Sequence, residues 1–246
     1  MGAEFHRAVA VTLVGRGYAF TQGAPTARQA ALTALFSCNH PQGRTRLCRL
    51  LAVDDRRVPE ALAPPAAGSG LAQAQAQQAP EPDPAALAAE RAAPSSALRE
   101  NLRTDAVRLP TPGSLEGVEV IDTAQLLQRL RSEAPPIVFD VAAEGERMIP
   151  GALHIVHGGR ALADAQADSA LERRFQALLR AAGAYTVRQP ALVFYGEGPN
   201  TWWAFNAALR AVAAGYPKVL WYRGGLEAWQ RAGMPTQQKT AVAVLS

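Results

Sequence analysis

Apolar runs and helix-like patterns alternate along the second half of the chain. Short runs of aliphatic and aromatic residues predict strands at residues 118–121, 136–141, 191–195 and 218–222. Helical patterns occur at residues 170–182, 202–214 and 226–232, and after Thr123, where three leucines share one face: Leu126, Leu127 and Leu130. Thr123 is the predicted N-cap of that helix. Strands that alternate with helices predict a parallel sheet covered by helices on both faces.

The start of the chain shows a different order. Strands are predicted at residues 8–14, 18–20 and 48–54, a helix at residues 27–38, and a turn at Asp54 and Asp55. The order strand, strand, helix, strand predicts a small α+β module over residues 6–58. A unit of ~50 residues has a weak hydrophobic core, so a covalent cross-link would stabilise it.

Residues 59–112, between these two parts, are rich in alanine, proline and glutamine. Segments such as 63–70, 73–78 and 80–84 bury too little apolar surface to offset the entropy of ordering the chain. Short helices are compatible with residues 85–91 and 95–103. We therefore predict a flexible linker, with partial order at most, that leads to a second domain at residues 113–238.

Composition narrows the class of protein. The chain has 246 residues, of which 48% are hydrophobic, and a formal net charge of +4. Its arginines are scattered among acidic residues, so no nucleic-acid partner is predicted. The sequence lacks the long apolar run of a transmembrane segment, so none is predicted. No signal peptide opens the sequence, and both an exported protein without its signal and a cytosolic protein fit that observation.

Cys38 and Cys48 are the only cysteines. Their even number and their proximity favour a disulfide between them, and two reduced thiols are the alternative. A metal site is disfavoured, because only His40 lies nearby and a tetrahedral site needs four ligands. A disulfide would favour a periplasmic or secreted protein, while a cytoplasmic location stays open.

Four motifs of the second half occur in a fixed order: Ile137-Val-Phe-Asp140-Val, Ile149-Pro-Gly-Ala152, the stretch 191–208, and Arg223-Gly-Gly225-Leu-Glu-Ala-Trp229. Together they resemble the rhodanese-like domain over about half of the chain. The resemblance implies an α/β fold, a rhodanese-like parallel sheet flanked by helices, beside the small N-terminal α+β module and the flexible linker. It extends to a bacterial subgroup, often exported, whose loop carries two cysteines followed by tryptophan. The residues that match this subgroup are Trp202, Phe205, Asn206, Ala207 and Ala208.

The N-terminal module has a resemblance of its own. Its stretches Ala34-Leu35-Phe-Ser-Cys38-Asn39 and Cys48-Arg-Leu-Leu-Ala-Val-Asp-Asp55 are similar to a small module of exported bacterial proteins. That resemblance implies no activity.

The loop after strand 191–195 departs from the rhodanese pattern. In active rhodaneses a cysteine at its first position carries a persulfide, and here that position is Gly196. Thr201 stands where the second cysteine of the subgroup lies. Helix and loop N–H groups lower the pKa of such a thiol, but glycine offers no group to activate. Sulfur transfer by the family mechanism is therefore not expected, and Thr201 is expected to cap the following helix.

The resemblance also implies a small concavity at this loop, even without the cysteine. If the loop keeps the family shape, its N–H groups surround a nest that can hold an anion. Against this, Glu197 adds a negative charge and Pro199 removes a donor. The candidate ligand-binding residues are Gly196, Glu197, Gly198, Asn200, Thr201, Trp202 and Arg160, the last as a side chain that could reach the pocket.

Neighbouring residues are interpreted as structural. One of Trp202 and Trp203 is expected to pack in the core and the other to line the pocket rim. Asp140 is expected to bond loop backbone, and His154 and His157 to be structural.

Three functional hypotheses follow. The first is a pseudoenzyme, a non-catalytic rhodanese-like protein that binds a protein partner or a small anion at residues 196–202. It requires no catalytic residue, metal or cofactor. The second is a sulfurtransferase-type enzyme that uses non-family residues, or a persulfide relay through Cys38 and Cys48. The third is a structural module for display or assembly.

Overall fold

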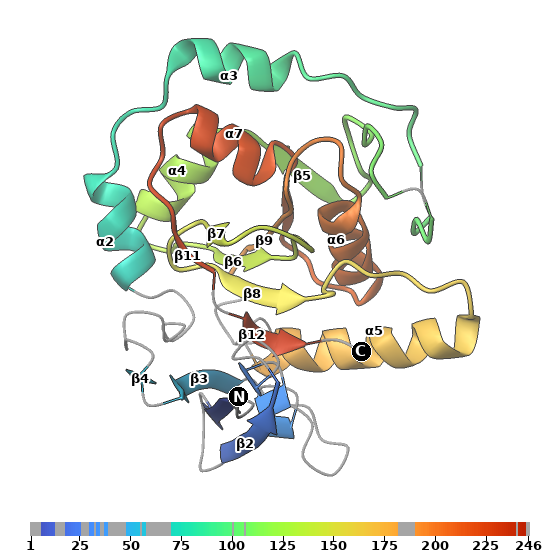
Figure 1. Cartoon of the computed structure of the whole chain (residues 1–246). Coiled ribbons are helices and arrows are strands. Elements are labelled where there is room, and N and C mark those ends of the chain that lie inside the picture. Colours follow the sequence, from blue (N-terminus) through green and yellow to red (C-terminus); the bar gives the residue numbers. More distant parts are fainter. Residues whose placement is uncertain are drawn as a thin grey trace.

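A computed structural model describes most of the chain (Figure 1). The described residues are 6–12, 18–25, 30–31, 33–34, 37–38, 48–54, 56–57, 70–99, 101–105, 107–181, 190–239 and 241–244. They form a small antiparallel sheet at the start of the chain and an α/β body that contains the rest.

The α/β body is built on a parallel sheet. Its order is β12-β8-β6-β9-β10-β5, and all five pairs of neighbours are parallel. The strands are β5 (Val118–Ile121), β6 (Ile137–Asp140), β8 (Leu153–Val156), β9 (Leu192–Tyr195), β10 (Val219–Tyr222) and β12 (Ala241–Val244). The predicted parallel sheet is therefore confirmed. The predicted domain ended at residue 238, and the edge strand β12 lies beyond that residue. This strand was not predicted, because a run of only four alanines and valines is a weak pattern.

Helices cover both faces of this sheet: α4 (Thr123–Arg131), α5 (Ala165–Ala181), α6 (Trp203–Ala213) and α7 (Gly225–Arg231). Successive residues of each strand face opposite sides. Phe194 of β9 packs with residues of α5 and α6, whereas Val193 packs with residues of α4 and α7. Both faces of the strand are buried, which is why the strand reads as a continuous apolar run. Residues 147–148 (β7) and 237–238 (β11) pair separately as an antiparallel ribbon.

The N-cap of α4 is Asp122, and the prediction of Thr123 was wrong by one residue. The Asp122 side chain accepts from the Gln125 N–H, and the Gln125 side chain accepts from the Asp122 N–H, which completes a capping box. The Thr123 hydroxyl is used elsewhere, by Glu90 and Tyr222.

The segment predicted as a flexible linker differs from that expectation over residues 70–99, 101–105 and 107–112. It contains α2 (Gly70–Gln78) and α3 (Pro84–Arg91), which lie beside α4 and α7. Its alanines reach the core under α4 and α7, and Arg131 donates to the carbonyls of Ala76 and Ala79, each at 2.9 Å. Polar bonds from the body therefore order a segment whose own composition predicts disorder.

The N-terminal module has the strand order β2-β1-β3-β4. The strands are β1 (His6–Thr12), β2 (Tyr18–Ala24), β3 (Cys48–Val53) and β4 (Arg56–Arg57). Helical residues lie between β2 and β3, at 30–31, 33–34 and 37–38. Small side chains fill its core, among them Ala8, Ala10 and Cys38. Asp54 makes the predicted turn at a φ of 53°, whereas Asp55 and His40 lie outside the described residues. Strand β12 lies beside β3, so the C-terminal strand contacts both parts.

Membrane-spanning segments were sought among the described residues, and no helix there is long and apolar enough to cross a bilayer.

Candidate functional site

The loop of residues 196–202 joins β9 to α6 and is held from the start of α7. The Leu226 N–H donates to the Gly196 carbonyl at 3.0 Å, and the Glu227 N–H donates to the Glu197 carbonyl at 2.8 Å. Gly225 has a φ of 62°, and a Cβ there would lie 2.6 Å from the Gly196 carbonyl oxygen. A glycine at position 225 is therefore what allows α7 to approach the loop.

Gly196 itself is buried but not forced to be glycine. A Cβ at this position would lie 3.3 Å from Thr201 Oγ1 and 3.8 Å from Ala204 Cβ, and its backbone has no positive φ. A Cβ at this position requires Thr201 to move by only a few tenths of an ångström. Backbone conformation therefore does not require glycine at position 196.

The donors of Gly198, Thr201 and Trp202 in the loop are already engaged. The Thr201 hydroxyl donates to the Gly198 carbonyl at 3.0 Å, and the Gly198 N–H lies 3.4 Å from the same hydroxyl oxygen. The N–H of Trp202 donates to the carbonyl of Val107 at 2.9 Å. The prediction that Thr201 caps α6 is wrong, because its hydroxyl closes the loop and Trp202 occupies the N-cap without a side-chain bond.

The charge at the loop is negative. Glu197 Oε1 accepts from the N–H groups of Ala143 and Glu144, at 2.9 and 3.1 Å, while Oε2 is buried without a hydrogen-bond partner. The Glu227 carboxylate lies against Gly198, where a Cβ would be 2.5 Å from Oε2. Two carboxylates beside the engaged donors oppose an anion in this nest.

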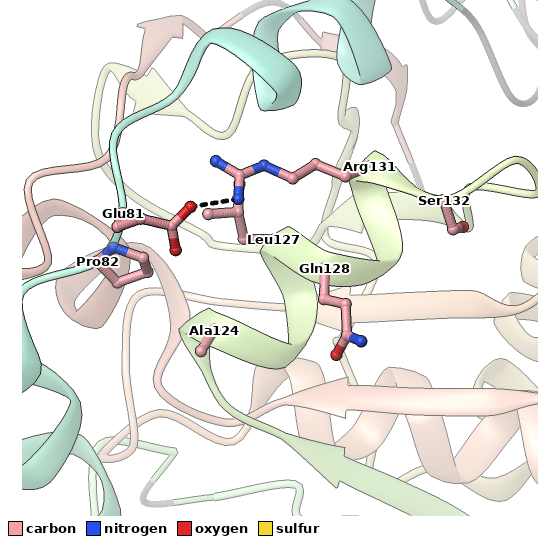
Figure 2. Close-up of a pocket in the computed structure, with 7 residues that line it drawn as sticks. All are labelled: Glu81, Pro82, Ala124, Leu127, Gln128, Arg131 and Ser132. Atoms are coloured by element: carbon pink, nitrogen blue, oxygen red, sulfur yellow. Dashed lines mark hydrogen bonds and ion pairs between the residues drawn. The ribbon is translucent and has the colours of Figure 1, made fainter.

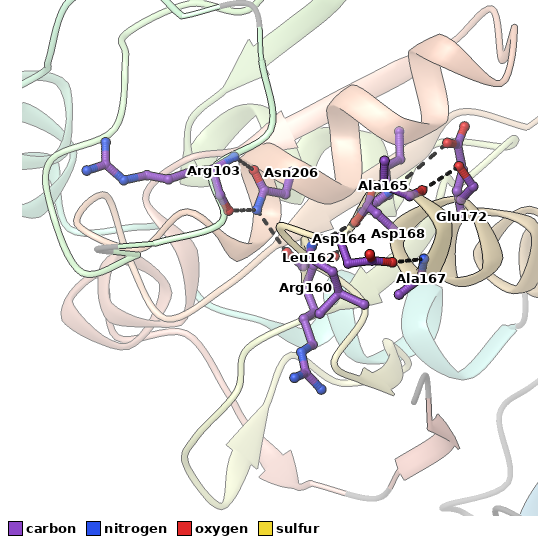
Figure 3. Close-up of polar contacts among 12 residues, drawn as sticks. Arg103, Arg160, Leu162, Asp164, Ala165, Ala167, Asp168, Glu172 and Asn206 are labelled. Carbon is purple, nitrogen blue, oxygen red and sulfur yellow. Dashed lines mark hydrogen bonds and ion pairs between the residues drawn. The ribbon is translucent and has the colours of Figure 1, made fainter.

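Arg160 is not brought to the loop. Its side chain is exposed, and Figure 3 shows the guanidinium directed away from Asn206. Among the described residues no hydrogen bond or ion pair holds that group. The Arg160 carbonyl instead accepts from Arg210 at 3.1 Å, and Asn200 is exposed.

A stretch of the segment that was predicted as a linker covers the loop. We call residues 101–105 and 107–112 the covering segment. Asn206 bonds both backbone groups of Arg103: its Oδ1 accepts from the Arg103 N–H and its Nδ2 donates to the Arg103 carbonyl, each at 2.9 Å (Figure 3). The Trp202 indole N–H donates to the carbonyl of Leu109 at 3.1 Å. The loop and α6 are thereby occupied by the protein's own chain.

The far end of the covering segment is held at Thr111, which is fully buried. Its N–H and its hydroxyl both donate to the Pro199 carbonyl, at 2.9 and 2.8 Å. Arg223 donates to the Thr111 hydroxyl at 3.1 Å and to its carbonyl at 3.2 Å, and also to the Pro94 carbonyl. Burial lowers the pKa of Arg223, but the side chain keeps its role as a donor.

Two of the remaining predicted residues have structural contacts. Asp140 Oδ1 accepts from the Ala142 N–H at 2.9 Å, as expected for a carboxylate that bonds loop backbone. His154 Nδ1 lies 3.2 Å from the Asp140 carbonyl oxygen, whereas His157 is exposed and its structural role stays a prediction. Trp202 is buried in the core and Trp203 is half-buried beside it.

A shallow depression of about 450 Å³ lies away from this loop, between α4 and residues 81–82 (Figure 2). The guanidinium of Arg131 borders it, but this group already bonds Ala76, Ala79 and Glu81. The depression therefore presents no unsatisfied charge to a ligand.

The sequence did not predict the contacts around the loop that Arg103, Thr111, Asn206 and Arg223 make. One feature of the sequence could have indicated them: Asn206 lies in a mainly apolar helical pattern, and a buried polar side chain needs hydrogen-bond partners. Asn206 is 0% exposed. Its partners lie about a hundred positions earlier, in a segment whose composition gives no indication of them.

One family model matches the α/β body. The sequence profile of the family described as "Rhodanese-like domain" matches residues 122–232. The comparison with curated proteins gave no match. Among solved structures, BH2092 protein from Bacillus halodurans is 21% identical over 49% of this chain and 77% of that chain, with a TM-score of 0.36. A full-length protein from Lactobacillus plantarum is 18% identical over 49% of this chain and 88% of that chain, with a TM-score of 0.36. A persulfide form of an EanB variant with ergothioneine is 19% identical over 51% and 32% of the two chains, with a TM-score of 0.36.

Proposed function

Given that residues 122–232 form a rhodanese-like domain, we propose that this protein is a non-catalytic rhodanese-like protein that acts by binding a protein partner. The observation that carries the proposal is the state of the loop after β9. Its first residue, Gly196, has no group that can carry sulfur, and the N–H of Trp202 is bonded to the Val107 carbonyl. A sulfur carrier needs both a thiolate and unoccupied donors around it.

A protein partner is favoured over a small anion. The carboxylates of Glu197 and Glu227 adjoin the loop, and Arg160 points away from it. The surface beside the loop, in contrast, already holds a stretch of polypeptide through bonds to its backbone. Chemistry of this kind suits recognition of another chain.

We further propose that the protein is exported and carries a Cys38–Cys48 disulfide. Cys38 is 3% exposed, and the described residues include no free cysteine. The side chain of Cys48 lies outside the described residues, so the bond itself stays a prediction. A Cys38 that is buried, and held in the proposed disulfide, would give no support to a persulfide relay through the N-terminal module.

The decisive experiment is a sulfur-transfer assay on the full chain with thiosulfate and with mercaptopyruvate as donors. We expect no transfer above that of the buffer. Sulfur transfer by the wild-type protein would overturn the proposal. Loss of such activity in Cys38→Ser would then assign it to the N-terminal cysteines, and retention would assign it to the pocket.

A further inference from the structure

We propose that the covering segment occupies a peptide-binding groove, and that an arginine-containing segment of a partner protein binds there in its place. The inference rests on the proposed function, because it names the class of partner and the surface that receives it. The groove runs along the N-terminal half of α6 and the loop before it, from Asn206 to Arg223.

The groove recognises main chain. Asn206 pairs with both the N–H and the carbonyl of Arg103, as one strand of a sheet pairs with the next, and its Nδ2 also donates to the Gly159 carbonyl. Trp202 continues the ladder with its backbone N–H and its indole N–H, which donate to Val107 and Leu109. Bonds to peptide groups alone do not depend on the sequence of the bound segment. A second polypeptide that places its peptide groups at the same positions can satisfy them.

Charge supplies the preference for arginine. The Arg103 guanidinium lies over the Trp202 ring, 4.9 Å from its centroid. Arg108 pairs with Glu144 at 2.6 Å, on the side of the groove where Glu197 also lies. Both arginines of the covering segment therefore face either an aromatic ring or carboxylates, and an acidic segment would meet repulsion at the same places.

The segment has an exposed part that can exchange and a buried anchor that exchange must also release. Thr104, Asp105 and Arg108 are exposed, Leu109 is 44% exposed, and Val107 packs against the core beside α6. The anchor is Thr111, which is fully buried and bonded to Pro199, together with the buried Pro112. Segments with few buried apolar contacts open at low free-energy cost. The covering segment is tethered to the groove, so it competes with a partner at an effective concentration on the order of millimolar. A partner must therefore be present at a higher concentration or bind the groove more tightly than the segment does.

The test uses the full chain and a fluorescent synthetic peptide of residues 101–112, with binding followed by anisotropy. Arg103→Ala weakens the tethered segment but leaves the groove unchanged, so the wild-type peptide should bind this variant roughly twofold to fivefold more tightly than it binds wild type. Arg99→Ala, an exposed arginine just before the covering segment, is the matched control and should bind the peptide as wild type does. The same peptide with alanine in place of Arg103 should bind roughly twofold to fivefold more weakly.

The groove side is tested by Asn206→Ala, which should abolish binding of the peptide while circular dichroism shows a folded protein. If that variant does not fold, the comparison of Arg103→Ala with Arg99→Ala decides alone. The inference would be overturned if the peptide bound wild type, Arg103→Ala and Arg99→Ala equally tightly. It would also be overturned if the peptide did not bind at concentrations several times the millimolar effective concentration of the tethered segment. Sulfur-transfer assays on the same preparations separate the two proposals. Failed peptide binding without sulfur transfer removes only this inference, whereas sulfur transfer removes the proposed function.

Discussion

Glu90 of α3 accepts two hydrogen bonds from Thr123, the first residue of α4. The backbone N–H donates to Glu90 Oε2 at 3.2 Å and the hydroxyl donates to it at 2.7 Å. The Thr123 hydroxyl oxygen is also 2.5 Å from the hydroxyl oxygen of Tyr222. Glu90 Oε1 is buried without a hydrogen-bond partner, so the carboxyl group is only half satisfied. A contact that contains a titratable group, Glu90, thus joins the segment predicted as a linker to the body.

This contact predicts a dependence of stability on pH. Burial raises the pKa of Glu90 above its ordinary value of 4.5, the nearby charge of Asp122 raises it further, and the Thr123 bonds and Arg91 oppose the shift. The stabilising effect of the protonated group is complete below pH 4.5 and is lost as the pH rises through the raised pKa. Acidification from about pH 7 to about pH 5 should therefore stabilise wild type relative to Glu90→Gln in urea unfolding. Glu116→Gln, an exposed control, should track wild type, and a difference between wild type and Glu90→Gln that does not change with pH would contradict the assignment.

Gly196→Cys should fold but remain a poor sulfur carrier. A cysteine Cβ at this position would lie 3.3 Å from Thr201 Oγ1, so Thr201 must move by a few tenths of an ångström, and the covering segment and two carboxylates surround the site. We expect its thiol to react with a thiol reagent roughly tenfold more slowly, or slower still, than in the unfolded chain, because reaction requires local opening. Adding Arg103→Ala should accelerate modification roughly twofold to fivefold, and adding Arg99→Ala should not. A thiol that reacts as fast in the native protein as in denaturant would show that the site is open.

Asp168 should be far more important to stability than its neighbour Glu172. The guanidinium of Arg210, 1% exposed, pairs with Asp168 at 2.5 Å and with Glu172 at only 3.9 Å (Figure 3 labels both acids). Two of its nitrogens, Nε and Nη1, already lack a hydrogen-bond partner. Asp168→Ala leaves this charge buried and should cost about 3 kcal/mol of unfolding free energy. Glu172→Ala should cost less than about 1 kcal/mol, and equal costs in chemical denaturation would contradict the difference.

The predicted disulfide can be counted directly. Thiol titration of the denatured chain should detect no free thiol before reduction and two after it. Cys38→Ser should lower the stability of the N-terminal module by about 3 kcal/mol, because a short closed loop is opened in the unfolded state. Ser37→Ala, an exposed neighbour, serves as the control. Two free thiols before reduction would remove the argument for export.

The strands of the body could be predicted because both of their faces are buried. Phe194 and Val193 pack against opposite layers of helices, so the run 191–195 has no polar residue to interrupt it. The leucine face of α4 was predictable in the same way, from the spacing of Leu126, Leu127 and Leu130. In these elements the local pattern carries the information, since each residue's environment repeats along the element.

The covering segment could not be predicted, because its bonds are made by carbonyl groups that every residue possesses. The carbonyls of Arg103, Val107 and Leu109 are chosen by Asn206 and Trp202, far away in the sequence. The same limit applies to the caps: a threonine before a helix predicts a cap, but at Thr201 and Thr123 other partners bind the hydroxyl. Competition among partners is a tertiary property that periodicity does not record.

The chain order of the groove has a consequence for synthesis. Arg103 precedes Asn206 by 103 positions, and Thr111 precedes Arg223 by 112. At roughly 5–20 residues per second, a ribosome delivers the covering segment some seconds before the helix that receives it. These contacts join residues that are far apart in the sequence, so during folding they form after the local contacts of the body. A nascent chain therefore carries the covering segment before Trp202 and Asn206, which hold that segment in the folded protein, have been made.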